Sequence, residues 1–286
     1  MSSLFRCATK TVILIFLGGL MGATLVRFAP GYGVTEEELD SRLNGESLRA
    51  LRASHEPPRD LMRFYLQFGG KLLHGDLGFS SAMREPVSQL IAERFPETMK
   101  SIGFSVALGW AAGLSLAILS VTARSATVDL GTSLVATIAL CTPAAVLALL
   151  CVIAQAPGRL VIAAIIFPKV FQYARNLLLR SAALPHVLAA SARGIRASRI
   201  FLWHILPVAA PQLLAVAGIT VSMAFTAAIP VEALCDIPGI GQLAWKAALA
   251  RDLELLVMLT MIVTTVTLLA NSTAELLGKV VVAGKA

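Results

Sequence analysis

Long uncharged runs alternate with short polar segments along most of this chain. The uncharged runs cover residues 11–26, 101–123, 130–158, 200–231 and 255–274, and a weaker run, 160–174, contains Lys169. An apolar segment of about 20 residues has the length of a helix that crosses a bilayer. The pattern predicts an all-α membrane protein with about six transmembrane helices.

The first uncharged run predicts an uncleaved transmembrane helix within residues 1–29. Arg6 and Lys10 precede this run, and Arg27 follows it. A secretory signal peptide has the same outline, but no Ala-x-Ala cleavage pattern comes after the run. The run is somewhat short, and the long side chain of Arg27 can extend from its end to the interface. We therefore expect this helix to remain in the membrane.

Residues 30–98 form a polar segment between the first two uncharged runs. Thr35 and Glu38 fit a capping box, and Asp60 can cap a second helix whose apolar residues recur at helical spacing. Helices of this kind lie on a membrane surface with their apolar face inward. We expect an external segment that contains amphipathic helices.

Composition and charge agree with a membrane protein and exclude other classes. The chain is 57% hydrophobic and 14% charged, which is far more apolar than an ordinary soluble domain. The net charge of +7 comes from scattered bases without an interleaved aromatic patch, so we expect no nucleic-acid partner. The four cysteines and four histidines lack the spacing of a disulfide framework or a metal site, and we interpret the cysteines as packing residues.

The basic residues predict the orientation of the chain. With the amino terminus inside, ten of the 24 Lys and Arg residues fall in cytoplasmic segments, whereas the short external loops hold three. Positive charge is enriched in cytoplasmic loops of membrane proteins. We therefore expect a multi-pass protein of the cell inner membrane, with both termini in the cytoplasm and a five-span core in residues 99–286.

Residues 180–207 form a basic polar loop between two apolar runs. Residues 189–193 are good helix formers, Gly194 permits a turn, and residues 197–204 restart a helix that Pro207 and Pro211 then disturb. Taken alone, this loop is either a solvated cytoplasmic loop or a docking site.

The spacing within this loop resembles the EAA loop of ABC-importer permeases. Ala189 and Ala190 are followed after three residues by Gly194, and the sequence HILP begins nine residues later. The resemblance implies a cytoplasmic coupling helix, residues 189–199, that contacts an ATPase. The implied contact residues are Ala189, Ala190, Arg193, Gly194, Arg196 and Arg199.

Three departures from the family pattern bear on this contact. The family usually places an acid where this chain has Pro185, and an arginine where it has Leu188. The stretch between the third and fourth spans is also shorter than is typical for the family.

Two further stretches resemble dipeptide, oligopeptide and nickel ABC permeases. Residues 75–80 (GDLGFS), with 86–87 and 96–98, are similar to the signature that enters the second span. Residues 228–232, 237–243 and 250–252 are similar to the external loop between the fifth and sixth spans, which implies an outer gate. The implied gate residues are Glu232, Asp236, Pro238, Gly239 and Gly241. A loop that dips back toward the pathway has non-helical backbone at membrane depth, and this backbone needs hydrogen-bond partners from protein or water. An exposed hairpin loop remains the alternative.

Lys169 is a candidate pathway residue. Nine residues of helix rise about 14 Å, which places its ammonium near the middle of the bilayer. A lysine there faces the bundle interior or a wet passage, because lipid exposure costs about 3 kcal/mol. Its partner is either a solute in the passage or a backbone carbonyl within the bundle.

The resemblance covers essentially the whole chain and identifies it as a type I ABC-importer permease, similar to the B-type subunit of peptide or nickel importers. It implies alternating access by a complex with a homologous permease, two ATPase subunits and an external solute-binding protein. The chain lacks a phosphate-binding Gly-x-x-x-x-Gly-Lys-Ser/Thr motif, so we expect no enzyme and no cofactor here, with ATP and Mg in the partner ATPase. A membrane scaffold or receptor without ATPase coupling is the alternative.

Overall fold

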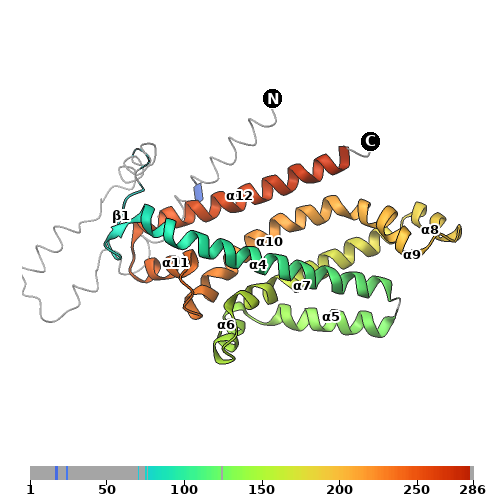
Figure 1. Ribbon diagram of the computed structural model, residues 1–286, viewed down its shortest axis with the longest axis horizontal. Helices are drawn as coiled ribbons and strands as arrows, with labels where there is room; N and C mark the ends of the chain where they lie inside the picture. Colours follow the sequence, from blue (N-terminus) through green and yellow to red (C-terminus); the bar gives the residue numbers. More distant parts are fainter. Residues whose placement is uncertain are drawn as a thin grey trace, which may run out of the picture. The chain divides into compact units, whose positions relative to one another are not determined.

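The computed structural model describes residues 77–123 and 125–283, together with Leu17, Gly18, Thr24, Gly70 and Gly75. The predicted first transmembrane helix and the amphipathic helices expected after Thr35 and Asp60 lie outside the described residues, apart from these isolated positions. The described part of the chain is almost entirely helical (Figure 1).

The described elements begin with a short hairpin, β1 (Phe79–Ser80) and β2 (Glu85–Pro86), whose strands pair antiparallel. The helices are α4 (Val87–Thr122), α5 (Ala126–Cys141), α6 (Ala144–Ile153), α7 (Gly158–Ala182), α8 (Pro185–Ala192), α9 (Ala197–Ile200), a π-helical turn η2 (Phe201–Ile205), α10 (Leu206–Leu234), α11 (Ile240–Leu249) and α12 (Leu253–Ala283).

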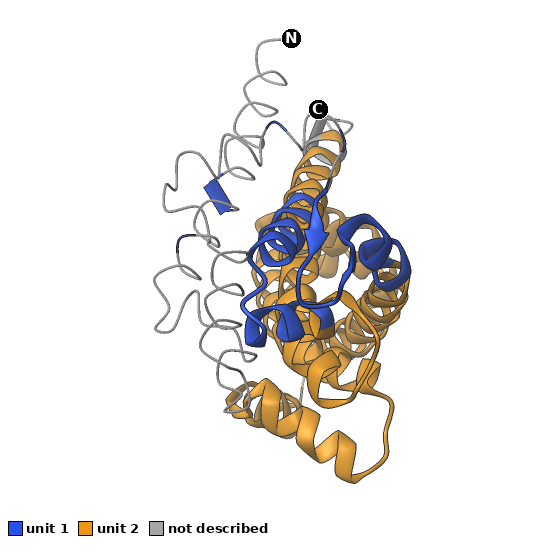
Figure 2. Ribbon diagram, turned by 90° about the vertical axis from the view of Figure 1, so that its left-hand side faces the viewer, with its two compact units in different colours: residues 1–95, 243–265 blue, residues 96–242, 266–286 orange. Residues whose placement is uncertain are grey.

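The chain divides into two compact units (Figure 2). Unit 1 contains residues 1–95 and 243–265, and unit 2 contains residues 96–242 and 266–286. Helices α4, α11 and α12 contribute residues to both units.

Among the described residues, four helical segments are long and apolar enough to cross a membrane. They are Val87–Thr122, Gly158–Ala182, Ala197–Leu234 and Leu253–Gly278, and the bent pair α5–α6 supplies a fifth if it is one crossing. The all-α membrane fold is therefore confirmed. The predicted total of about six includes the first helix, which the described part of the chain does not test.

The uncharged run 130–158 is not one straight helix, as its length suggested. Helices α5 and α6 meet at 94° across Thr142 and Pro143. Pro143 has no backbone N–H to continue the ladder of α5, and the residue before a proline is driven out of the helical region. Thr142 is extended, with φ −84° and ψ 120°, so the chain turns there and restarts.

Two other boundaries differ from the uncharged runs. Helix α4 begins at Val87, fourteen residues before the run that starts at residue 101, and continues past Pro96. Helix α7 runs without a break through Pro168 and Lys169. An uncharged run marks the part of a helix that can cross the hydrocarbon core of the bilayer. The helix itself can extend beyond this part into polar surroundings, as long as its backbone hydrogen bonds are formed.

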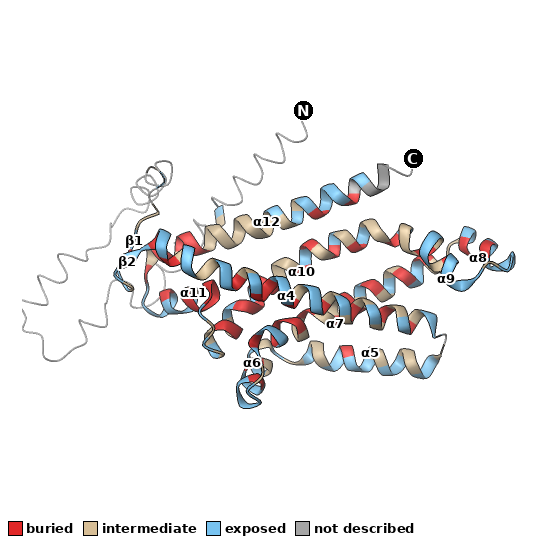
Figure 3. Ribbon diagram, in the orientation of Figure 1, coloured by how far each residue is buried: buried red, intermediate tan, exposed pale blue. Residues whose placement is uncertain are grey.

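Helix α7 has buried residues along most of its length (Figure 3). It packs against α10, α5 and α6, and the side chains of Phe171 and Leu178 are completely buried. Helix α4 approaches it at Gly113, where an added Cβ would lie 2.7 Å from the carbonyl oxygen of Phe167. Trp110 Nε1 of α4 also donates to Thr220 Oγ1 of α10 at 2.9 Å. These contacts make a bundle with α7 at its centre.

In unit 1, Asp252 joins the hairpin to the beginning of α12. Its Oδ2 accepts hydrogen bonds from Ser80 Oγ at 2.6 Å and from the Ala82 N–H at 3.1 Å. Its Oδ1 accepts the Leu255 N–H at 3.1 Å, which is the bond of a helix N-cap. One carboxylate therefore caps α12 and fixes the turn that precedes α4.

Candidate functional site

The 180–207 loop folds as two short helical pieces at one end of unit 2. Helix α8 ends at Ala192, and Gly194 then takes φ +72°, a left-handed conformation that favours glycine. Helix α9 restarts at Ala197 and leads into η2. The predicted order of helix, turn at Gly194 and second helix is confirmed, whereas a continuous coupling helix over residues 189–199 is wrong, because α8 begins at Pro185 and ends before the left-handed turn.

The inner face of this loop belongs to the core of unit 2. Val187 and Ala190 of α8 are 5% exposed and pack with Ile200, Ile205 and Leu178. The loop is thus a fixed extension of the bundle.

The outer face of the loop carries the predicted coupling residues except Ala190. Ala189, Arg193, Gly194, Arg196 and Arg199 are exposed. The three arginines form no ion pair with another described residue. Leu188 is 58% exposed on the same short helix. This surface presents positive charge beside an apolar side chain.

Pro185 explains how α8 forms without the acid that the family usually has there. Pro185 occupies the first helical position, and its N-cap residue Leu184 makes no side-chain capping bond. Proline at this position has a fixed φ suited to a helix, and its missing N–H would be unpaired there in any case. An acid stabilises a helix start through the helix dipole, whereas this chain starts the helix through backbone geometry.

The entry to α10 contains a π-helical turn. The Leu206 N–H bonds to the Phe201 carbonyl, and Pro207 follows at the start of α10. Pro207 lacks the N–H that would bond to Trp203, so the ladder must rearrange nearby. Pro211 lies inside α10, which continues to Leu234. The disturbance expected from the prolines is therefore confined to η2.

The predicted gate residues surround a buried carboxylate at the opposite end of α10. The side chain of Glu232 is 0% exposed. Its Oε2 accepts the Gly241 N–H at 2.7 Å and Thr98 Oγ1 at 3.3 Å. Thr98 Oγ1 in turn accepts the Ile240 N–H at 2.7 Å. Glu232 and Thr98 thus satisfy two free N–H groups at the start of α11.

The two glycines permit this close approach. A Cβ on Gly239 would lie 2.1 Å from Glu232 Oε2, and one on Gly241 would lie 2.8 Å from the carbonyl oxygen of Ala228. Both positions are too crowded for a side chain. The loop of residues 235–239 (the 235–239 loop) therefore folds back against α10 and is not an open hairpin.

The remaining gate residues lie on the surface of the 235–239 loop. Asp236 and Pro238 are exposed, and Asp236 adopts φ +50°. Gln242 Nε2 donates to Asp236 Oδ1 at 2.6 Å. Glu232 and Asp236 were expected to lie together at a solvated mouth, but only Asp236 is exposed. Glu232 points from the last turn of α10 into the protein.

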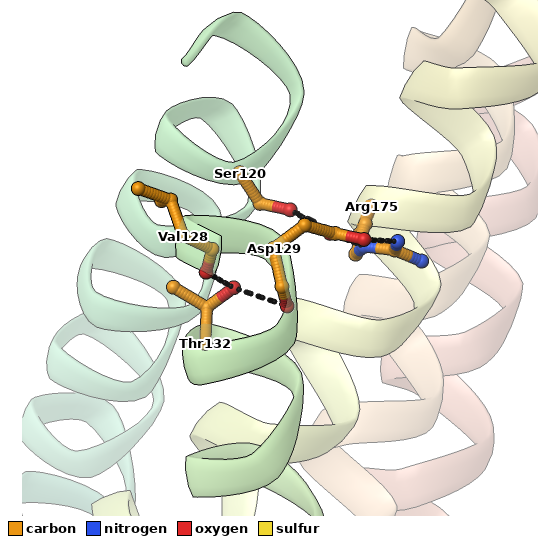
Figure 4. Close-up of polar contacts among 5 residues, drawn as sticks. All are labelled: Ser120, Val128, Asp129, Thr132 and Arg175. Atoms are coloured by element: carbon orange, nitrogen blue, oxygen red, sulfur yellow. Dashed lines mark hydrogen bonds and ion pairs between the residues drawn. The ribbon is translucent and has the colours of Figure 1, made fainter. Parts of the chain in front are cut away.

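Sequence reasoning missed an ion pair that joins three helices (Figure 4). Arg175 of α7 binds Asp129 of α5 through two hydrogen bonds, Nε to Oδ1 at 2.7 Å and Nη2 to Oδ2 at 2.5 Å. Ser120 of α4 donates to Asp129 Oδ1 at 2.5 Å, and Arg175 Nε also lies 3.2 Å from Ser120 Oγ. An open cavity of about 320 Å³ adjoins them, also lined by Val121, Ser125, Ala126 and Leu179.

A signal for this pair is present in the sequence. Asp129 is the only acidic residue between Glu97 and Glu232. A lone acid beside an apolar run needs a cationic partner. Arg175 is one of the ten bases that the charge pattern assigns to cytoplasmic segments, and the sequence alone did not show that it pairs with Asp129.

Lys169 is half-buried on α7 and forms no hydrogen bond or ion pair with another described residue. Pro168 before it is buried. The carbonyl bond suggested for the lysine is therefore absent among the described contacts, and its role stays a prediction.

A family model matches residues 106–283 of this chain: the binding-protein-dependent transport system inner membrane component. The chain therefore belongs to this family of inner-membrane transport subunits. The resemblance to ABC-importer permeases and the prediction of a multi-pass inner-membrane protein are confirmed.

This chain also matches individual relatives over most of their length. The chain is 25% identical to a protein of Brucella suis named as a peptide permease, over 92% of this chain and 94% of that protein. It is 27% identical to the oligopeptide transport system permease OppB of Haemophilus influenzae, over 88% and 89% of the two chains. The fold is shared with a chain of the inward-facing MetNI methionine ABC transporter, at TM-score 0.61 and 17% identity, covering 68% of this chain and 97% of that one.

Proposed function

We propose that this subunit passes di- or oligopeptides across the inner membrane by alternating access. The observation that carries the proposal is the match to peptide and oligopeptide permeases over about nine-tenths of the chain. Buried polar contacts of the kind formed by Glu232 and Thr98 also support a gate whose backbone groups are satisfied without water.

The proposed complex contains a homologous permease, two cytoplasmic ATPase subunits and an external solute-binding protein. In this arrangement both termini and the 180–207 loop face the cytoplasm, and the 235–239 loop faces outward. ATP and Mg bind the ATPase subunits, which supply the energy of transport.

The exposed face of the 180–207 loop is the proposed ATPase contact. Gly194 leaves open space beside it, since nothing lies within 4 Å of an added Cβ. Arg193, Arg196 and Arg199 are available to acidic groups, and Leu188 supplies apolar area where the family usually has an arginine. The packed inner face transmits movement, because Val187 and Ala190 contact the same core as α7 and α10.

The test is uptake by the complex reconstituted in vesicles. We expect a radiolabelled dipeptide to accumulate only with ATP and the binding protein, and nickel to serve as the comparison solute. Accumulation of nickel and not peptide would place the chain with the nickel importers. ATP-independent accumulation would contradict the proposal.

The second candidate is a membrane scaffold or receptor without ATPase coupling, favoured by Pro185 and Leu188 in place of the usual charges. Copurification separates the two functions, because only an importer requires the ATPase. Absence of an ATPase from the complex isolated in mild detergent would favour the scaffold.

A further inference from the structure

Two cysteines that are far apart in the sequence meet at one end of unit 2. Cys151 lies in the last turn of α6, and Cys235 directly follows α10. The side chains of the two cysteines lie near each other, because each sulfur contacts the short segment of residues 148–158 around the end of α6. Cys235 Sγ also lies 4.0 Å from the carbonyl oxygen of Ala148, which precedes Cys151 by three residues on α6.

The surroundings of the two thiols hold them in this arrangement. Cys151 is 7% exposed, and its Sγ donates to the Ala156 carbonyl at 2.9 Å. Cys235 is half-buried, and a Cβ added to Gly158 would lie 3.3 Å from its Sγ. Helices α6 and α10 pack directly on each other. Neither thiol takes part in the bonds that Glu232 forms.

We propose that Cys151 and Cys235 form a reversible disulfide that joins the end of α6 to the beginning of the 235–239 loop. This rests on the proposed orientation, which places both cysteines on the outer, oxidising side of the membrane. The earlier interpretation of all four cysteines as packing residues is replaced for this pair.

The oxidant is a protein disulfide of an external thiol oxidase. The thiolate of Cys235, the more accessible of the two, attacks one sulfur of that disulfide and releases the other as a thiolate, which gains a proton. The thiolate of Cys151 then attacks Cys235 Sγ in the mixed disulfide and releases the second oxidase thiol. The two cysteines lose two protons and two electrons, and the oxidase disulfide becomes two thiols.

The disulfide would restrict the 235–239 loop at its first residue, Cys235. Glu232 and Thr98 hold the start of α11, and the new bond would hold the residue that follows α10. A cross-link removes alternative conformations of the segment that it joins. The oxidised protein would therefore keep the loop against α10 and transport more slowly than the reduced protein.

The test uses the full chain in membrane vesicles, with Cys7→Ser and Cys141→Ser so that only the pair remains. After treatment with diamide at mildly alkaline pH, free thiols are blocked, disulfides are reduced, and the newly released thiols are labelled with a polymer-bearing maleimide. We expect two labels on a monomer, and none when Cys151→Ser or Cys235→Ser is added. The matched control is a chain whose only cysteines are Cys141 and Cys235, and we expect no maleimide label on it.

Thiols that stay free after oxidation, or a cross-linked dimer, would overturn the proposal. Mass spectrometry of the unaltered chain searches for the same Cys151–Cys235 peptide pair and needs no substitution, so a folding defect in a variant cannot hide the result. Because labelling does not require transport, a failed cross-link and a failed importer assay give separate answers.

Discussion

Glu232 illustrates how one buried side chain can organise a loop. The carboxylate and Thr98 hold two successive N–H groups at the start of α11, while Gly239 leaves the space that the carboxylate occupies. When a buried acceptor is removed, its donors stay buried without a partner, and the folded state is destabilised by the cost of their desolvation. The 235–239 loop is therefore sensitive to substitution of Glu232.

We predict that Glu232→Ala lowers the free energy of unfolding by about 1–3 kcal/mol, because the Gly241 N–H and the Thr98 hydroxyl lose their acceptor. Thermal unfolding of the detergent-purified chain measures this loss. Glu232→Gln keeps an acceptor oxygen and should lose less. The control is Glu97→Gln, which changes an exposed acid of the same unit. Equal stability of Glu232→Ala and Glu97→Gln would show that the bonds do not hold the loop.

Lys169 permits a test of charge in the passage. If its ammonium lines the passage, Lys169→Met should change uptake of anionic peptides relative to cationic ones, while Lys169→Arg keeps the preference. Uptake of both peptide classes, normalised to the amount of assembled complex, is the measurement. Equal loss for all peptides together with poor assembly would assign the lysine to packing instead.

At the scale of elements, the 180–207 loop combines a buried face with an exposed one. The buried face fixes α8 on the bundle, and the exposed face is offered to a partner. Gly194 lies where the backbone turns between α8 and α9. A side chain there affects both the turn and any surface that approaches it.

We predict that Gly194→Trp uncouples ATP hydrolysis from uptake, because the indole fills the open space and the left-handed φ disfavours it. Uptake should fall toward the level measured without ATP while the amount of membrane protein stays constant. Gly194→Asn is the matched control, since asparagine tolerates this conformation and is small. Normal uptake and ATPase stimulation in Gly194→Trp would remove this surface from the coupling contact.

The ion pair of Asp129 and Arg175 joins elements instead of shaping a loop. It links α5 to α7, and Ser120 adds α4. The side chains are 37% and 23% exposed, so the bond is partly accessible. Its role in unit 2 is to hold three helices in register at one end.

We predict that Asp129→Asn or Arg175→Met destabilises the purified chain by about 1 kcal/mol, a value reduced for the partial exposure of the pair. The double variant should cost less than the sum of the two single variants, because neither charge remains alone. A thermodynamic cycle built from the three unfolding transitions gives the coupling. Strict additivity would mean that the pair contributes no net stability.

At the scale of the whole molecule, the proposed function requires the two loops to lie on opposite sides of the membrane. In a chain without its native cysteines, we predict that Asp236→Cys reacts with an impermeant maleimide from outside. We expect Arg196→Cys to react only after the membrane is made permeable. Because both positions are exposed, the reaction with the reagent depends on the side of the membrane and not on burial. The reverse pattern would invert the topology.

The sequence by itself determined the fold class and the family. Long uncharged runs can be buried only in lipid or against one another, and the spacing of small residues, glycines and prolines marks the two loops. Both properties are local, so they can be recognised without coordinates. The left-handed turn at Gly194 belongs with them, because glycine supplies that conformation through its own backbone.

The tertiary structure decided which distant residues meet. Thr98 reaches Glu232, Asp129 reaches Arg175, and Cys235 reaches the carbonyl of Ala148 across separations that no periodicity encodes. It also decided that run 130–158 bends at Pro143, and that Glu232 is buried while Asp236 is exposed. Such pairings depend on how helices rotate and pack. The sequence pattern predicts the apolar face of each helix. Only the packing of the helices determines which residue a polar side chain contacts.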